Sequence, residues 1–161
     1  MQGDMYGVDT GQGPALELGI LPGDRFETTP AKGRTAALHQ AWRSVYNALI
    51  VCQFQNPGVE RLVRAFDAVT GWGMDAASLL HTGKRIVTLK RLFNIRRGLS
   101  REHDRLPKLL LQPLEDGGTE GRVPDVEALL SGAYSEYGWD AHTGNPLPET
   151  LELLGLDRFN A

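Results

Sequence analysis

The residues with the clearest potential for chemistry are one cysteine and four histidines. Cys52 is the only cysteine among 161 residues, so the chain contains no intrachain disulfide. The histidines, His39, His81, His103 and His142, do not follow any metal-ligand spacing. We predict that the first two lie on helix surfaces and the last two in loops. Cys52 follows an apolar stretch with no adjacent base or cation, and its residue type and context predict a small buried side chain rather than a reactive thiolate.

Motifs for nucleotide binding and for serine hydrolysis do not occur in the sequence. We find neither a phosphate-binding glycine loop followed by Lys-Ser/Thr, nor a dinucleotide fingerprint, nor G-x-S-x-G. A net charge of -3 is not that of a nucleic-acid binder. No apolar run approaches the ~18 residues of a membrane span, and the first residues do not resemble a signal peptide. The sequence therefore predicts a cytoplasmic protein that binds neither nucleic acid nor membrane.

Apolar residues recur every three or four positions through most of the chain, which is the pattern of helices packed by one face. We predict a first helix from a cap at Thr35 to the break at 56–58. Further helices are expected over 59–69, from Asp75 to 97, over 125–137 and over 148–154. The helix predicted from Asp75 to 97 is apolar over a wide arc, so we expect it to be the central helix of the bundle. Because no convincing period-two stretch appears, the predicted fold is all-α, an irregular helical bundle.

Two regions are predicted from the change in composition. Residues 1–33 are rich in glycine and proline, which predicts a loop-rich N-terminal segment with a helical turn near 15–18 that lies on another surface. Residues 34–161 form the predicted helical domain.

Several segments of that domain resemble one known family. They are A-V-T-G-W at 68–72, G-x-R-I at 83–86, R-x-F-N-x-R at 91–96, most of R-E-G-x-x-R-x-D-D-x-L-P at 96–107, and G-W-D with T-G-x-P at 138–146. In this combination, over about residues 18–157, the chain resembles the C-terminal helical domain of the tungsten-containing aldehyde ferredoxin oxidoreductases. The resemblance implies that residues 1–33 are the remnant of a preceding domain. Most of these motifs are expected to be structural.

The family resemblance also implies a site. In the family a helix ends in D-x-x-G-L-C, whose cysteine is the fourth ligand of a [4Fe-4S] cluster and whose aspartate approaches the pterin of the tungsten cofactor. The corresponding stretch here runs from Asn47 to Cys52. Cys52 would thus be a metal ligand, and Asn47 and Val51 cofactor-binding residues. Asn47 keeps the hydrogen-bonding capacity of the aspartate but not its charge, and Ile50 adds bulk where the family has glycine.

The implied function is one part of an oxidoreductase. The family enzyme converts aldehydes to carboxylic acids with a tungsten or molybdenum bis-pterin and passes electrons through the cluster to ferredoxin. A [4Fe-4S] cluster takes four thiolates, and the chain has one. We therefore expect the lone chain to be inactive, to hold no cofactor, and to need the missing N-terminal and middle domains or a complementing subunit. The alternative is a non-catalytic helical interaction module derived from the same domain, which the residues at 47 and 50 favour and the retained cysteine opposes.

Overall fold

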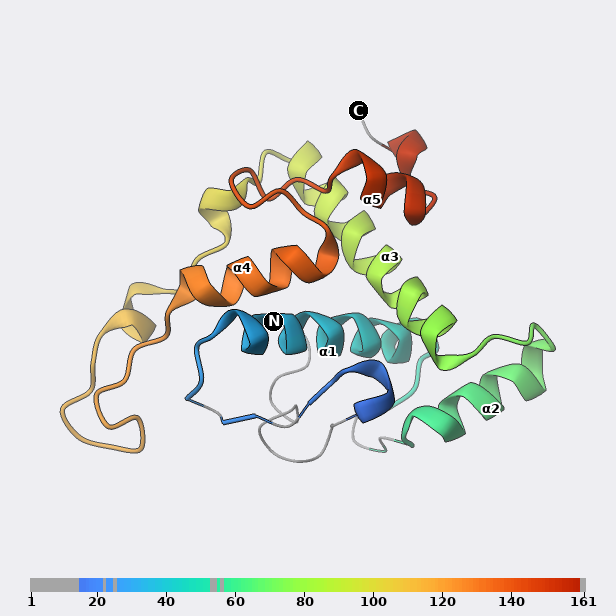
Figure 1. Cartoon of the computed structure of the whole chain (residues 1–161), viewed down its shortest axis with the longest axis horizontal. Helices are drawn as coiled ribbons and strands as arrows, with labels where there is room; N and C mark the ends of the chain where they lie inside the picture. Colours follow the sequence, from blue (N-terminus) through green and yellow to red (C-terminus); the bar gives the residue numbers. More distant parts are fainter. Residues whose placement is uncertain (1–14, 22, 25, 53–54, 56, 160–161) are drawn as a thin grey trace.

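The computed structural model describes residues 15–21, 23–24, 26–52, 55 and 57–159 (Figure 1). Five α-helices are present in this part of the chain: α1 (Pro30–Ala48), α2 (Val59–Thr70), α3 (Ala76–Arg96), α4 (Val126–Tyr137) and α5 (Pro148–Leu153). Short 3-10 helices occur at Leu16–Leu18 (η2), Arg101–His103 (η3), Lys108–Leu111 (η4) and Asp157–Phe159 (η5). The only β-pairing among the described residues is two isolated bridges. The predicted all-α fold is confirmed.

The segment before α1 packs onto the bundle. Leu16–Leu18 form the predicted turn, which Gly19 closes in the left-handed conformation at φ 72°. Ala15, Leu18 and Ile20 are buried in the core cluster that α1 and its neighbours form. Residues 15–20 of the segment therefore lie on the surface of the bundle, as predicted. Residues 1–14 of the predicted loop-rich region lie outside the described residues.

The amino end of α1 lies at Pro30, five residues before the predicted cap at Thr35. The Oγ1 of Thr29 accepts a hydrogen bond from the Lys32 N–H at 3.3 Å, and a proline suits the first helical position because its missing N–H would have no helical partner. The prediction was wrong because the first turn carries small and charged residues rather than the apolar repeat that marks the rest of the helix. The predicted start of the helical domain at residue 34 therefore lies within α1.

The central helix is α1, and the prediction that α3 takes this place was wrong. Ten of the nineteen residues of α1 are buried, and Figure 1 shows α4 lying along it while α3 crosses its carboxyl-terminal half. On α3, by contrast, Leu89 and Phe93 are 42% and 63% exposed. The apolar arc of α3 is as wide as the sequence indicates, but no described element covers its outer side.

Three helical glycines allow this close packing. A Cβ added at Gly33 would lie 1.9 Å from the carbonyl oxygen of Leu129, and one at Gly132 would lie 1.8 Å from that of Pro30. At Gly83, a Cβ would lie 2.2 Å from the carbonyl oxygen of Ala41. Helix α1 is therefore in near backbone contact with α4 at Pro30 and Gly33 and with α3 at Ala41.

Glu136 joins the three packed helices by charge. Its carboxylate lies 2.6 Å from Arg34 on α1 and 2.6 Å from Lys84 on α3, and only 9% of its side chain is exposed. The adjacent Tyr137 is buried, and its hydroxyl donates a hydrogen bond to the carbonyl of Ala37 at 2.8 Å. These contacts fix the rotation of α4 about its axis relative to α1.

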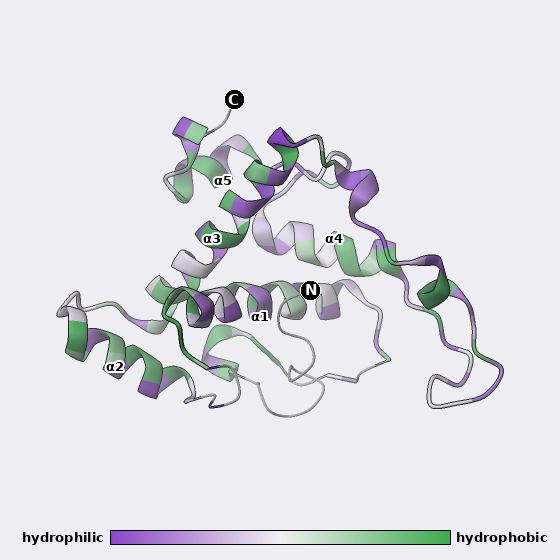
Figure 2. Ribbon diagram, turned by 180° about the vertical axis from the view of Figure 1, so that it is seen from behind, coloured by the Kyte–Doolittle hydropathy of each residue, from purple (hydrophilic) through white to green (hydrophobic). Residues whose placement is uncertain are grey.

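The remaining helices extend the bundle at its ends. Helix α2 packs through Val59 and Leu62 on the cluster shared by α1 and α3, and Leu151 of α5 packs on Leu92 of α3. The bounds of α2, α3, α4 and α5 agree with the predicted helices to within two residues. Figure 2 shows several hydrophobic residues along α2. Val69, near the carboxyl end of this helix, is 86% exposed. None of the described helices has the length and apolar character needed to cross a membrane.

Candidate functional site

The carboxyl end of α1 lies at Ala48, well before the predicted break at 56–58. The N–H of Val51 donates to the carbonyl of Tyr46 at 2.9 Å, and the N–H of Ile50 donates to that of Asn47 at 3.3 Å. This pair of bonds, with Ile50 in the left-handed conformation at φ 57°, is a Schellman termination of the helix. Apolar periodicity did not indicate it, since Leu49 and Val51 continue to pack on the core after the helix has ended.

Ile50 occupies the position where this termination favours glycine. A left-handed backbone places the Cβ of an L-residue close to its own carbonyl oxygen, and a β-branched side chain makes the conformation rarer still. Ile50 has no compensating contact of size, because 92% of it is exposed. The backbone conformation alone thus favours glycine at this position, independently of any neighbouring group.

Ile50→Gly is expected to raise the free energy of unfolding by about 1 kcal/mol, because relief of the left-handed strain exceeds the entropy cost of glycine. Urea denaturation of the two proteins measures the difference. Ile50→Ala is the matched control: it removes the same exposed apolar side chain but keeps a Cβ, so it should recover much less. A loss of stability in Ile50→Gly would show that the isoleucine side chain holds the end of α1.

Cys52 lies beyond the helix and is exposed as a free thiol. The prediction of a buried side chain was wrong, because it assumed that α1 continues past this residue. Asn47 is also exposed, on the last turn of α1, whereas Val51 is half-buried against the core. The three residues that the resemblance singled out therefore lie at one end of one helix, where Val51 anchors the backbone and the side chains of Asn47 and Cys52 are accessible from outside.

The described residues do not complete a metal site by themselves. No group of three or more histidine, cysteine or acidic side chains in this part of the chain could hold a metal ion. An accessible thiol fits the role of one ligand among several. The end of α1 thus offers one side chain of a type that can ligate iron.

Three of the family-like segments meet at Arg91 on α3. Its Nε donates to the carbonyl of Gly144 at 2.9 Å and its Nη1 to the carboxylate of Asp104 at 2.9 Å. The hydroxyl of Tyr134 donates to the same carboxylate. Burial and the Asp104 carboxylate raise the pKa of Tyr134 to about 12, so the hydroxyl remains a donor. The sequence predicted a structural role for these motifs but did not predict this network. Only the occurrence of the motifs together, and not any single motif, could have indicated it.

His39 is buried, and the prediction that it lies on a helix surface was wrong. It is 1% exposed, and its Nε2 accepts a hydrogen bond from Nε of Arg43 at 3.1 Å. Burial, with a smaller effect from the nearby Arg43 charge, lowers the pKa of His39 to about 4. His81 and His142 are exposed as predicted, and His103, also exposed, lies in η3 rather than in a loop.

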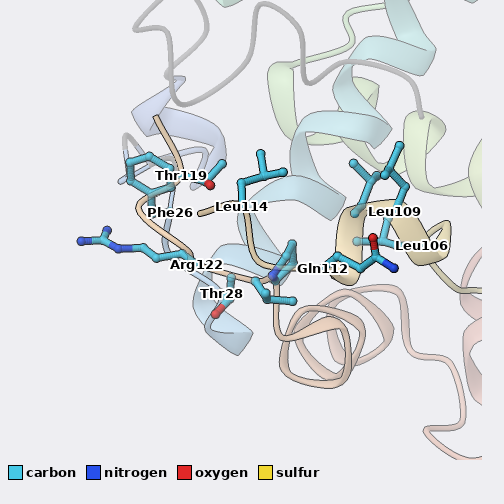
Figure 3. A pocket seen from close by; sticks show the side chains of 11 residues that line it. Phe26, Thr28, Leu106, Leu109, Gln112, Leu114, Thr119 and Arg122 are labelled. Atoms are coloured by element: carbon cyan, nitrogen blue, oxygen red, sulfur yellow. The ribbon is translucent and has the colours of Figure 1, made fainter. Parts of the chain in front are cut away.

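An open apolar hollow of about 420 Å³ lies between η4 and the segment before α1 (Figure 3). Phe26, Leu106, Leu109 and Leu114 are among the residues that line it. Arg122 points away from the hollow in Figure 3, with its guanidinium over the ring of Phe26 at 4.9 Å. The lining holds no pair of titratable groups suited to acid–base chemistry, so we place the candidate site at the end of α1.

Comparison with known proteins identifies the family. A family model described as aldehyde ferredoxin oxidoreductase, domains 2 and 3, matches residues 2–156. The tungsten-containing aldehyde ferredoxin oxidoreductases of Pyrococcus furiosus and Pyrococcus horikoshii are 34% and 30% identical over 140 residues, or 84% of this chain. That of Thermococcus kodakarensis is 29% identical over the same length. The chain spans 23% of the length of these relatives. On these matches the chain belongs to the aldehyde ferredoxin oxidoreductase family, within the part formed by domains 2 and 3.

Proposed function

We propose that this chain acts as the C-terminal helical module of an aldehyde ferredoxin oxidoreductase-like enzyme with a tungsten or molybdenum pterin and an iron–sulfur cluster. In this proposal Cys52 supplies one thiolate to a [4Fe-4S] cluster, and Asn47 and Val51 lie against the pterin. The observation that carries it is the accessible free thiol of the only cysteine, directly after the end of α1. Residues 1–33 are then the remnant of the preceding domain and 34–161 the helical domain, working in the cytoplasm, where a free thiol persists.

Each residue at the end of α1 has a defined part in this proposal. The N–H of Val51 is committed to Tyr46, so Val51 fixes the backbone that presents its neighbours. The amide of Asn47 can donate or accept a hydrogen bond, but it binds a polar group less strongly than the family's carboxylate does. When bound, the pterin metal centre supplies the two-electron oxidation of aldehyde to carboxylate, and the cluster passes the electrons on to ferredoxin. The other three thiolates come from the preceding domains or from a complementing subunit, and the lone chain is inactive.

The alternative function, a non-catalytic interaction module, rests on a different observation. Trp72 and Phe93 are 71% and 63% exposed, and Ile50 stands exposed at the proposed site itself. Exposed apolar side chains mark contacts with other proteins where they form a contiguous patch. The same surfaces are expected under the first proposal, so the role of Cys52 decides between the two.

Cys52→Ala separates the two functions. When the chain is assembled with a polypeptide that supplies three cluster thiolates, the variant is expected to lose stoichiometric iron and the electron-paramagnetic-resonance signal of the cluster, because one of four ligands is gone. In the lone chain the same change should alter the free energy of unfolding by less than ~1 kcal/mol, since the thiol is exposed. This second measurement is the control for folding.

An unchanged cluster signal in the assembled variant would contradict the ligand role of Cys52 and would favour the interaction module. A Cys52→Ser variant extends the comparison, because a hydroxyl of similar size retains the shape of the side chain but is a much poorer iron ligand.

A further inference from the structure

The outer side of α3 carries two large apolar side chains at the surface. Leu89 and Phe93 lie one helical turn apart, and therefore on the same side of the helix. They are 42% and 63% exposed. Val87 and Arg91, which are buried, lie on the opposite side of the helix. The apolar pair is thus not part of the protein's own core and is accessible to a partner.

Arginines flank this apolar pair at both ends. Arg85 precedes Leu89 by one helical turn, and Arg96 and Arg97 follow Phe93 by one turn, so all five residues lie on or beside one side of the helix. The three arginines are exposed. Helix α3 itself contains no acidic residue. We call these five residues the α3 face, which has an apolar centre between two positive ends.

The positive charge of the α3 face is not compensated within the part of the chain that the structure describes. No carboxylate in that part forms an ion pair with Arg85, Arg96 or Arg97. Arg96 donates a hydrogen bond to the carbonyl of Phe159 at 2.7 Å, but this acceptor is neutral and leaves the charge of the arginine in place. The face therefore favours a partner with negative charge.

We propose that the α3 face docks an acidic amphipathic helix of a partner protein. The apolar residues of the partner would cover Leu89 and Phe93, and its carboxylates would pair with the arginines at the two ends. Arg85 and Arg96 are about 16 Å apart along the helix axis, so the partner needs carboxylates with a similar separation.

Other occupants fit the α3 face less well. A second copy that used the same face would bring arginines against arginines, because such a contact is the same patch on both subunits. A nucleic-acid backbone would satisfy the arginines but would leave the apolar centre without a contact. The proposal goes beyond the role proposed for Cys52 and does not depend on it, because the thiol lies after the end of a different helix.

The test measures binding of a fluorescently labelled synthetic peptide to the whole chain by fluorescence anisotropy. The peptide is a helix with leucines along one side and glutamates before and after them. It is expected to bind with a saturating curve and to bind more weakly as the salt concentration rises. Two comparison peptides, one with lysines in place of the glutamates and one with alanines in place of the leucines, should each bind about tenfold more weakly or worse.

Two variants of the chain locate the binding on α3. Phe93→Gln and Arg97→Glu change exposed side chains, so they retain the fold, and each is expected to weaken binding of the acidic peptide by about tenfold. The matched controls are Leu109→Gln in η4, whose leucine is 73% exposed, and Arg64→Glu on α2, whose side chain is 79% exposed. Both controls should bind the peptide as the parent chain does.

Three results would overturn the proposal. The first is the absence of saturable binding of the acidic peptide to the parent chain. The second is equally tight binding of the peptide with alanines, which would show attraction by charge alone. The third is an equal loss of binding in the control variants, which would place the contact elsewhere on the protein.

Discussion

Gly132→Ala is expected to lower the free energy of unfolding by about 3 kcal/mol or more, because the added methyl group has no space between α4 and α1. Its Cβ would lie 1.8 Å from the carbonyl oxygen of Pro30 and 2.6 Å from the carbonyl carbon. Both atoms belong to backbone, so relief requires one whole helix to move away from the other. Such a movement also strains the contacts of Glu136 with Arg34 and Lys84.

The direction of this change is the informative part of the measurement. Intrinsic helix propensity favours alanine over glycine by about 1 kcal/mol, so propensity and packing predict opposite signs at Gly132. Ser131→Ala is the matched control on the same helix. Ser131 is exposed, and its replacement by the better helix former should raise the stability slightly. Urea denaturation of the three proteins would refute the close packing of α1 and α4 if Gly132→Ala were as stable as the parent chain.

The helices that sequence reasoning located well have strong local signals at their ends. Asp75 and Asp125 cap α3 and α4 as their positions indicate, each accepting a hydrogen bond from a backbone N–H three residues later. Gly71 and Gly138 close α2 and α4 in the left-handed conformation. In each of these interactions the two partners lie within a few residues of each other in the sequence. A local sequence pattern can therefore indicate them.

The ends of α1 and the choice of the central helix depend on less local information. The helix terminates at a left-handed Ile50, a residue type that gives no stop signal. The arc of apolar residues on α3 shows what is apolar but not what covers it. Gly33 and Gly132 decide which helices can approach closely. In the sequence alone they indicate only low helix propensity.

The same distinction applies to the candidate site. Asn47, Val51 and Cys52 are close in sequence, so a resemblance could place them together. The exposure of Cys52 depends on where α1 ends, and the burial of His39 depends on the elements that pack around the helix. Both were predicted wrongly for this reason. Partners that are distant in sequence, such as Arg91 and Gly144, could not be paired from spacing alone.

The second large effect is expected at Arg91, where Arg91→Met should lower the free energy of unfolding by about 3–5 kcal/mol, the range typical for breaking a buried ion pair by removal of one partner. Arg91 is 7% exposed, and its loss leaves the Asp104 carboxylate, 25% exposed, without a counter-charge. The carbonyl of Gly144 loses its donor as well. Arg101→Met is the control, because Glu127, its partner, is 79% exposed and such a pair contributes about 1 kcal/mol or less.

A double-mutant cycle shows whether the ion pair itself causes the effect at Arg91. If it does, Asp104→Asn should cost much less in the Arg91→Met background than in the parent chain, because the charge that it removes is by then unpaired. Equal costs in both backgrounds would assign the loss to packing of the arginine against Trp139, whose ring centroid lies 5.2 Å from the guanidinium carbon. A strong coupling would show that one arginine on α3 holds the η3 segment, the carboxyl half of α4 and the turn at Gly144 in register. The family-like motifs would then be explained by one interaction among residues that lie up to 53 positions apart in the chain.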